Sequence, residues 1–542
     1  MRGSTEWRWV ACLALVLGGS VMGAAAQDAA VPQSPRPVAL DGFDAWVERT
    51  RTTFDVPGIA VAIVRDGEVV LARGYGVRAL GDEAPMDAHT LFAIASNTKA
   101  FTSMSLSILA DEGKLDLNDR VIDHLPWFRM ADPYVTREMR LRDLLTHRSG
   151  LGLGAGDLLF WPTTDYSTRE VAERLARVPL SGGFRERYAY DNILYGVAQL
   201  VVEAASGMSY ADFLQARIFD PLDMSDTRFN SDHLRPSDDN VATGHAKSDF
   251  SRLGPVPRMS WANVSGAGGL YSSVDDLSKW MRVLLDGGRF DAGDARLVSE
   301  RRLRGMWSLA TPIAIGEPAV PELAPAVPAF SGYGEGWSVS DYRGRKLVWH
   351  TGGWPGMVSR LTLVPQERLG IVVLTNQEVG AAFNAITLRA LDVLLDAGTH
   401  DWIAAYAAAL AKGQGKADED WRKHLAARDA ASKPSLPLAK YAGRYRDDWY
   451  GDIVVERSGK GLALRFTRTP QLLGDLEHWQ HDSFVVRWRD RALNADAFLT
   501  FALDADGGIR EARMEAISPL TDFSFDFHDL RLVPVPAEPA KH

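Results

Sequence analysis

The chain contains a single Ser-x-x-Lys quartet, Ser96-Asn97-Thr98-Lys99, directly before an apolar run over residues 101–109. If the quartet opens a helix, residues three positions apart share one face, so the Lys99 amine can reach the Ser96 hydroxyl. Serine is a weak nucleophile that needs a neighbouring base, and a lysine whose pKa is lowered by burial in a cleft can supply one. The quartet therefore predicts an acylated Ser96 with Lys99 beside it. By itself, it also fits an N-cap serine followed by a surface lysine.

A second group of polar residues, Tyr190-Asp191-Asn192, precedes a helical run that begins near Leu194. A phenol beside a lysine ammonium can be held ionised or poised, so that Tyr190 takes the serine proton and returns it to the leaving group. We predict that Asn192 orients Lys99 and the amide of the substrate. A tyrosine that only packs before a helix is the alternative.

A third group, His350-Thr351-Gly352-Gly353, ends the strand-like run over residues 346–349. Glycines at a strand edge allow the substrate backbone to approach and pair, so Thr351, Gly352 and the following Trp354 are predicted to bind substrate. The Gly353 and Ser96 N–H groups are our candidate oxyanion hole. A structural histidine at the end of a strand is the alternative for His350.

These groups need a sheet and helices to position them, and the hydrophobic periodicity predicts both. Helices are expected over residues 43–53, 100–113 and 194–205, a hairpin over residues 59–64 and 68–75 turned at Asp66-Gly67, and strands over residues 339–350, 359–364 and 369–374. Sheet elements thus flank a mostly helical middle.

The last 140 residues have a different pattern. Residues 401–437 are rich in Ala, Lys and Asp and predict a helical linker, whereas residues 438–537 alternate as short strands. The alternation includes a hairpin over residues 453–466, another over residues 498–514, and the run Phe523, Phe525 and Phe527. About 100 residues of short strands predict a small antiparallel barrel or sandwich.

The N-terminal 26 residues combine Arg2 and Arg8 with a short apolar stretch and a small-residue end, which predicts a signal peptide cut before Gln27. The mature protein is therefore expected to be periplasmic or secreted, with no stable membrane anchor. The only cysteine of the full sequence, Cys12, falls inside the predicted signal peptide, which excludes a cysteine nucleophile or disulfide in the mature chain. A net charge of −10 argues against nucleic-acid binding, and no His-Glu-x-x-His motif occurs, so neither a metal nor another cofactor is expected.

Together, the three groups resemble the Ser-x-x-Lys, Tyr-x-Asn and Lys/His-Thr-Gly motifs of the serine β-lactamase and penicillin-binding-protein superfamily. Residues 92–99, 144–151 and 266–273 are similar to its class C-like branch. Over residues 40–400 the resemblance implies an α+β fold, in which an antiparallel sheet flanked by helices packs beside a helical lobe, with the site in the cleft between them. It implies a serine hydrolase whose catalytic residues are Ser96, Lys99, Tyr190, Asn192 and His350. Residues 438–537 are similar to a lipocalin-like barrel appended to many such hydrolases.

His350 stands where the family often has a lysine that binds a substrate carboxylate, and a mostly neutral histidine is a weaker anchor for anions. The resemblance therefore favours a peptidase or amidase acting on small or linear peptides, including D-residue or nonribosomal ones. The layout is also similar to that of bacterial peptidases of linearised microcystin. A carboxylic esterase or a β-lactamase using the same serine, and a non-catalytic binding protein with the same fold, stay open as alternatives. The sequence gives no oligomeric state.

Overall fold

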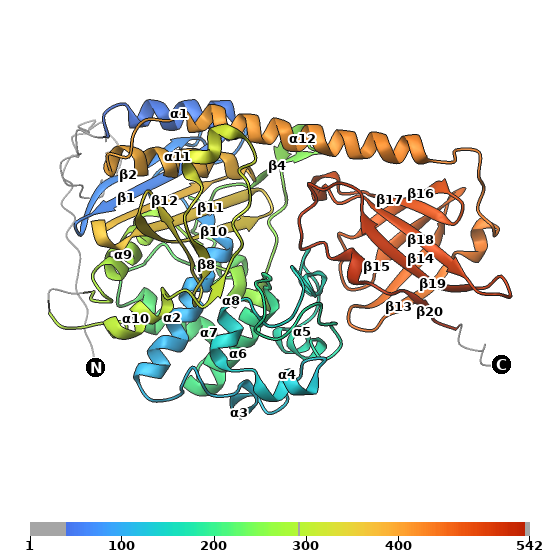
Figure 1. Cartoon of the computed structure of the whole chain (residues 1–542), viewed down its shortest axis with the longest axis horizontal. Coiled ribbons are helices and arrows are strands. Elements are labelled where there is room, and N and C mark those ends of the chain that lie inside the picture. The colour runs from blue at the N-terminus through green and yellow to red at the C-terminus, as the bar shows by residue number, and fades with distance from the viewer. Residues whose placement is uncertain (1–39, 291–292, 537–542) are drawn as a thin grey trace, which may run out of the picture. The chain divides into compact units, whose positions relative to one another are not determined.

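The computed structural model describes residues 40–290 and 293–536. The predicted signal peptide, residues 1–26, lies outside this range. Two folded parts follow each other along the described chain, and the single long helix α12 (Trp402–Ala427) connects them in sequence (Figure 1). This helix lies within the predicted linker.

The first part is built on an eight-stranded antiparallel sheet. Strands from the beginning and the end of this part of the chain lie side by side in the sheet, because β1 pairs with both β2 and β12. Across the sheet, the strands are β2 (Glu68–Gly76), β1 (Gly58–Arg65), β12 (Leu369–Thr375), β11 (Met357–Val364), β10 (Arg345–Trp354), β9 (Ser338–Tyr342), β8 (Ser331–Tyr333) and β7 (Thr311–Pro312).

Turn residues explain two of the hairpins. Asp66 and Gly67 both have positive φ, as the tight turn between β1 and β2 requires, which confirms the predicted hairpin. Arg343 and Gly344 also have positive φ and divide the run predicted as one strand over residues 339–350 into β9 and β10.

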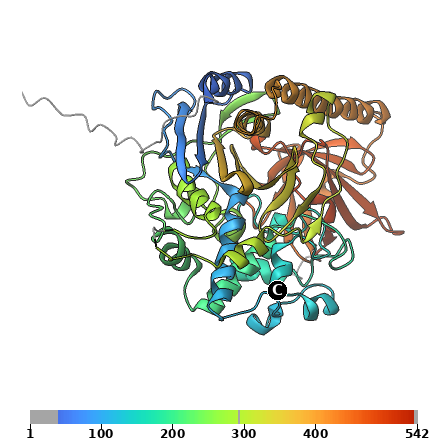
Figure 2. The same ribbon diagram turned by 60° about the vertical axis from the view of Figure 1, so that its left-hand side comes forward.

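Helices cover both faces of this sheet (Figure 2). Ile59, Val61 and Ile63 of β1 share a core with helices α1 (Phe43–Thr53) and α11 (Gly380–Leu394). Gly370 of β12, one residue out of phase with the core residue Ile371, instead meets α9 (Val274–Leu285). Successive residues of a strand point to opposite faces, so α9 packs on the face away from α1 and α11.

The helical lobe comes from the middle of this part of the chain. Its helices are α2 (Thr98–Asp111), α3 (Val121–His124), α4 (Pro133–Glu138), α5 (Thr168–Arg174), α6 (Ile193–Ser206), α7 (Tyr210–Leu214), α8 (Ser265–Gly268) and α10 (Glu300–Met306). Two small sheets accompany them, formed by β3 (Phe92–Ala93) with β6 (Tyr271–Ser272), and by β4 (His245–Ser248) with β5 (Arg252–Pro255).

The second part is a nearly closed antiparallel barrel. In chain order, its strands are β13 (Gly443–Asp447), β14 (Gly451–Ser458), β15 (Gly461–Phe466), β16 (Leu473–Gln480), β17 (Ser483–Trp488), β18 (Ala497–Leu503), β19 (Ile509–Ala516) and β20 (Val533–Pro534). The sheet runs from β19 to β20, and the two ends meet where Ala512 and Leu532 exchange backbone hydrogen bonds of 2.8 and 3.0 Å.

One prediction for this barrel is wrong. Phe523, Phe525 and Phe527 alternate like a strand, but Phe523 lies in a turn, Phe525 follows it, and Phe527 begins the short 3-10 helix η12 (Phe527–Asp529). Phe525 and Phe527 are both buried, and Phe527 stacks on Trp488 inside the barrel. The spacing thus reflects burial in a compact loop rather than the pleat of a strand.

No helix within residues 40–290 and 293–536 has both the length and the apolar character needed to cross a bilayer.

Candidate active site

Ser96 lies in a single 3-10 turn, η2 (Ala95–Asn97), immediately before α2. The preceding residue, Ala95, has a φ of 48°, in the left-handed region that a residue with a Cβ seldom adopts. Such strain persists where the surrounding structure enforces it, and it is concentrated at functional sites. Ser96 is buried, with just 8% of the residue exposed.

Lys99 is fully buried with its amine at the Ser96 hydroxyl. Its Nζ lies 3.0 Å from Ser96 Oγ, 2.7 Å from Asn192 Oδ1 and 2.9 Å from the Ala267 carbonyl oxygen. An amide oxygen and a carbonyl oxygen are acceptors only. Lys99 Nζ can donate to all three oxygens when it is protonated, and a neutral amine also fits, because its two N–H groups can face the two acceptors while its lone pair faces the serine hydroxyl.

The electrostatics agree with this arrangement. Burial lowers the pKa of Lys99 to about 7, although the carboxylates of Asp157 and Asp191 act to raise it. A substantial fraction of the protein then has the amine ready to accept a proton near neutral pH.

The value of kcat/KM is consequently expected to have an acid limb with an apparent pKa near 7. Below that pH, protonated Lys99 cannot take the serine proton, so kcat/KM should fall about tenfold per pH unit. Rates measured from pH 5 to 9 with a neutral substrate test this. A profile that stays level down to pH 5 would assign the proton to another group.

Tyr190 completes this group. Its phenol hydrogen-bonds Ser96, and burial raises the pKa of the phenol well above its usual value despite that bond. Of the two forms that the sequence left open, burial favours a protonated, poised phenol over an ionised one. Lys99 Nζ also lies over the Tyr190 ring, 4.8 Å from its centroid.

The segment over residues 144–151 positions this tyrosine. The His147 ring packs on the Tyr190 ring with centroids 4.2 Å apart. The backbone N–H groups of Ala189 and Asp191 donate to His147, at its carbonyl oxygen (3.0 Å) and at its Nδ1 (3.2 Å). The chain on both sides of Tyr190 is therefore tied to one buried histidine.

His350 has protein partners at both ring nitrogens. Its Nδ1 lies 2.6 Å from the Thr351 carbonyl oxygen, an acceptor, so Nδ1 carries the hydrogen and Nε2 accepts from the Tyr333 hydroxyl at 2.8 Å. Burial lowers the pKa of His350 to about 3, with the Lys99 charge acting in the same direction. His350 is thus a neutral wall of the site and not a cationic anchor.

Beyond His350, strand β10 offers an open backbone edge. β9 pairs with β10 only from Arg345 to Trp349, whereas β11 continues the pairing from Val348 to Trp354. Thr351, Gly352 and Gly353 therefore have one edge that no described strand covers. Gly352 packs closely on the Ser96 turn, because a Cβ there would lie 2.2 Å from the Ile94 carbonyl oxygen.

We expect Gly352→Ala to destabilise the fold by about 1–3 kcal/mol, because β10 must move away from the Ser96 turn to make room. Gly353→Ala is the matched control, since no described atom lies within 4 Å of a Cβ at that position. Urea unfolding of both variants checks the prediction. Equal free energies of unfolding for Gly352→Ala and Gly353→Ala would show that the close approach of β10 to the Ser96 turn does not require a glycine at position 352.

The Beta-lactamase family matches residues 43–395, more than half of the chain. The chain belongs to the beta-lactamase family. A second match, to a domain of unknown function (DUF3471), covers residues 427–534, which include the whole barrel.

Relatives of this beta-lactamase-family protein include an enzyme named unguisins hydrolase from Aspergillus violaceofuscus, 27% identical over 79% of each chain. Protein flp of Staphylococcus aureus is 25% identical over 62% of each chain. Among solved structures, the octameric penicillin-binding protein homologue from Pyrococcus abyssi has a TM-score of 0.57 at 22% identity, over 91% of this chain and 99% of that one. D-amino acid amidase from Ochrobactrum anthropi has a TM-score of 0.54 at 22% identity, over 66% and 98%.

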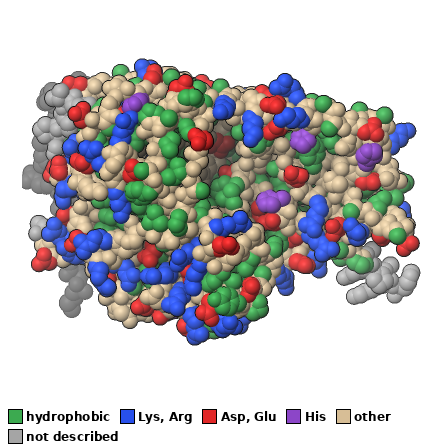
Figure 3. Space-filling model, in the orientation of Figure 1, with side chains coloured by type: hydrophobic (Ala, Val, Ile, Leu, Met, Phe, Trp, Pro, Cys, Tyr) green, Lys and Arg blue, Asp and Glu red, His purple; other side chains and the backbone are tan. Residues whose placement is uncertain are grey.

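A cavity of about 780 Å³ opens at the end of β10 in this beta-lactamase-family protein. Gly353 and Trp354 line it, together with Trp161 of the helical lobe, Leu410 of α12 and Phe525 of the barrel. The space-filling view shows a hollow in the illustrated face with hydrophobic and acidic side chains around it (Figure 3). Its volume is in the range of small-molecule sites. The predicted subsite residue Trp354 lines this cavity, although it is itself buried and packs on Trp261.

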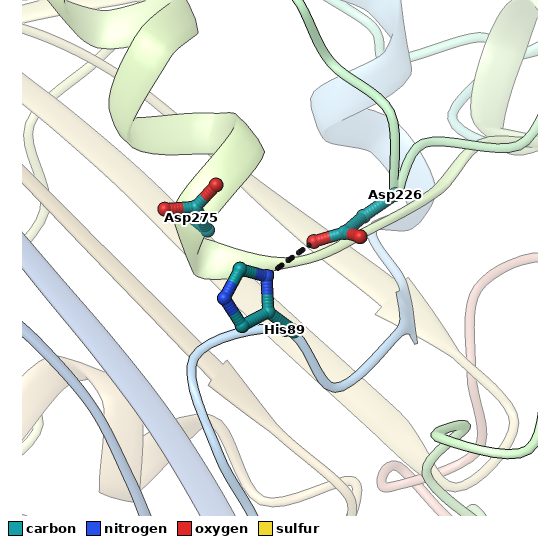
Figure 4. A group of neighbouring side chains, drawn as sticks. All are labelled: His89, Asp226 and Asp275. Carbon is teal, nitrogen blue, oxygen red and sulfur yellow. Dashed lines mark hydrogen bonds and ion pairs between the residues drawn. The ribbon is translucent and has the colours of Figure 1, made fainter. Parts of the chain in front are cut away.

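A histidine and two aspartates form a separate cluster (Figure 4). His89 Nδ1 lies 2.9 Å from Asp226 Oδ2, which also accepts from the Ser273 hydroxyl at 2.8 Å, and Asp275 pairs with Lys279 at 3.2 Å. Burial acts to lower the pKa of His89, but the bond to Asp226 and its charge outweigh this and raise it. Protein partners thus account for all three side chains, and we assign no metal to them.

The structure brings the predicted residues Ser96, Lys99, Tyr190, Asn192 and His350 into one site. It adds partners to which the sequence did not point, namely the Ala267 carbonyl, Asp157 and Ser524, and it places the Tyr333 hydroxyl at His350. A signal existed for Ala267, because it lies in the family-like segment 266–273. Asp157 and Ser524 are isolated polar residues in the sequence and offered none.

Proposed function

We propose that this protein is an exported serine hydrolase that forms an acyl-enzyme on Ser96 and acts as a peptidase or amidase on small or linear peptides. The observation that carries the proposal is the Lys99 amine, buried beside Ser96 Oγ with acceptors at its other contacts. A non-catalytic binding protein would have no use for a desolvated lysine at a serine hydroxyl.

In the proposed mechanism, Lys99 takes the Ser96 proton while Oγ attacks the substrate carbonyl carbon. The developing oxyanion receives hydrogen bonds from the Ser96 and Gly353 N–H groups. Tyr190 gives its proton to the leaving nitrogen and regains one from Lys99, which breaks the scissile bond and leaves an ester on Ser96. Water then attacks the ester by the same proton transfers in reverse, which releases the acid product and restores Ser96.

The charges around the site support a substrate without a carboxylate next to the scissile bond. His350 is neutral, and Lys247, the cationic residue of the described cavity wall, is already paired with Asp55 at 2.7 Å. The wall also contains Glu378, Asp490 and Asp522. The described residues that line the cavity thus offer no unpaired cation to an anion, and an unpaired buried charge is costly. This disfavours β-lactams and peptide C-termini as anionic ligands.

The names of similar proteins support a hydrolase in general terms. Their names include a hydrolase of unguisins and a D-amino acid amidase. The apolar cavity beside the β10 edge fits an extended chain that pairs with Thr351–Gly353 and places side chains against Trp354 and Phe525.

A substrate panel tests the proposal. Purified mature protein and Ser96→Ala are assayed with short peptide amides in L and D forms, the matching free acids, p-nitrophenyl esters and a chromogenic cephalosporin. We expect turnover of amides, at least about tenfold faster than of the matching free acids, because a buried unpaired carboxylate is costly. Faster turnover of the cephalosporin than of every amide would overturn the substrate assignment.

Export is proposed from the N-terminal segment alone. Expression of the full chain in a Gram-negative host is expected to yield a periplasmic form that begins at Gln27, as read by N-terminal sequencing. An unprocessed chain in the cytoplasmic fraction would contradict this assignment.

A further inference from the structure

The barrel contributes residues to the catalytic site through the loop mispredicted as a strand. We call residues 522–527 the docking segment. Its Ser524 donates to Asp157 Oδ2 at 2.9 Å, and its Asp526 accepts from the N–H groups of Gly156 (2.7 Å) and Leu158 (3.1 Å). Asp157 and Asp526 are fully buried, and Ser524 is 5% exposed. The docking segment thus hydrogen-bonds the turn over residues 154–158 at Asp157 and on both sides of it.

The same turn leads to the catalytic groups by two routes. Asn192 Nδ2 donates to Asp157 Oδ2 at 2.8 Å, and Asn192 Oδ1 accepts from Lys99 at 2.7 Å. Gly154 N–H donates to the Tyr190 carbonyl oxygen at 2.9 Å, and Phe523 packs edge-on against the Tyr190 ring. Both sides of the Ser96 environment are therefore connected to the barrel.

Asp157 decides which way the Asn192 amide faces. A carboxylate oxygen that already accepts from Ser524 can only be approached by the NH₂ end of the amide. The oxygen end of Asn192 must then face Lys99, where it accepts one of the two N–H groups of a neutral amine. If the amide were reversed, its NH₂ group would face the amine and stop Lys99 from keeping a lone pair directed at Ser96.

We propose that the docking segment of the barrel is a positioning element of the active site, in which Ser524 and Asp157 fix the Asn192 amide and thereby the Lys99 amine beside Ser96. This inference rests on the proposed acyl-enzyme function, which it deepens. It also gives the C-terminal barrel a defined role: the acylating site is complete only with residues from both parts of the chain.

The pH dependence separates this role from a merely structural one. Asp157 acts to raise the pKa of Lys99, so removal of its charge should move the acid limb of acylation to lower pH. Burial raises the pKa of Asp157, and the Ser524 hydrogen bond opposes that rise. Loss of the Ser524 hydrogen bond should therefore reduce the negative charge on Asp157. The acid limb of acylation should then also move to lower pH, by less than when the Asp157 charge is removed altogether. Other titratable groups also surround the two residues. Those around Lys99 are Asp191, Tyr190, Tyr195, His147 and His350. Those around Asp157 are Asp522 and Asp526.

The test measures the rate constant for labelling of the full-length mature protein by a fluorophosphonate probe between pH 5 and 9. We expect Ser524→Ala to label about tenfold more slowly than wild type, and Asp157→Leu about 100-fold more slowly, because Asn192 loses its partner. Asp157→Asn keeps an oxygen for Asn192, so it should recover most of the plateau rate while its acid limb moves to lower pH.

Arg468→Ala is the matched control. Arg468 pairs with Asp165 at 3.0 Å, an exposed contact between the same two parts of the chain that does not reach the site. It should label at the wild-type rate, and thermal unfolding verifies that all four variants are folded. Wild-type rates in Ser524→Ala and Asp157→Leu, or equal slowing in Arg468→Ala, would overturn the positioning role alone. Absence of labelling in wild type would overturn the acyl-enzyme function together with it.

Discussion

Replacement of Ser96 by alanine is expected to reduce kcat/KM by about 10⁴-fold or more, the scale seen when a serine hydrolase loses its nucleophile. Among the described residues, the alcohol hydroxyl that contacts the Lys99 amine is that of Ser96, so no other serine or threonine is placed to take over the attack. The fold should be unaffected, since only one oxygen atom is lost from a small buried side chain. Steady-state kinetics with the fastest substrate of the panel measure the effect.

Ser107→Ala is the matched control for this variant. Ser107 is a buried serine on the same helix, α2, and its hydroxyl has no hydrogen-bond partner among the described residues. It should retain wild-type kcat/KM. Activity of Ser96→Ala within tenfold of wild type would mean that another group is the nucleophile.

Lys99→Met is expected to reduce kcat/KM by about 10³-fold, within the range for loss of a general base. Methionine preserves most of the buried volume, and it removes an amine that is costly to charge in this setting. The free energy of unfolding should stay within about 2 kcal/mol of wild type, because the desolvation cost of the amine is removed while Asn192 Oδ1 and the Ala267 carbonyl oxygen lose their donor. Kinetics and urea unfolding of the same preparation check both parts.

Lys99→Arg distinguishes proton transfer from simple electrostatics. A guanidinium carries the positive charge but cannot give up its proton, so this variant should be as inactive as Lys99→Met. Recovery of a tenth or more of the wild-type kcat/KM by arginine would indicate that Lys99 acts by charge alone, and the acid limb near pH 7 would need another source.

The local part of the site was predictable from sequence because its geometry is local. Ser96 and Lys99 are three residues apart at the start of an apolar helical run, and helix geometry alone places one beside the other. Turn residues fixed the β1–β2 hairpin in the same way. The open edge of β10 followed from the glycines after His350.

The contacts between residues far apart in the sequence were not predictable, because no local sequence pattern indicates which distant residues meet. Asp157 and Ser524 are 367 positions apart and meet only in the folded chain. His350 was expected near the substrate, but its neutrality depends on Tyr333, which lies on another strand. The alternation of Phe523, Phe525 and Phe527 was misleading, since burial in the docking segment and burial in a pleated strand can produce the same spacing.

Intact-mass analysis after treatment with a fluorophosphonate probe tests the central claim most directly. Wild type should gain the mass of one probe, peptide mapping should locate it on Ser96, and Ser96→Ala should gain nothing under the same conditions. Labelling at a different residue, or equal labelling of Ser96→Ala, would contradict a catalytic acyl-enzyme at Ser96.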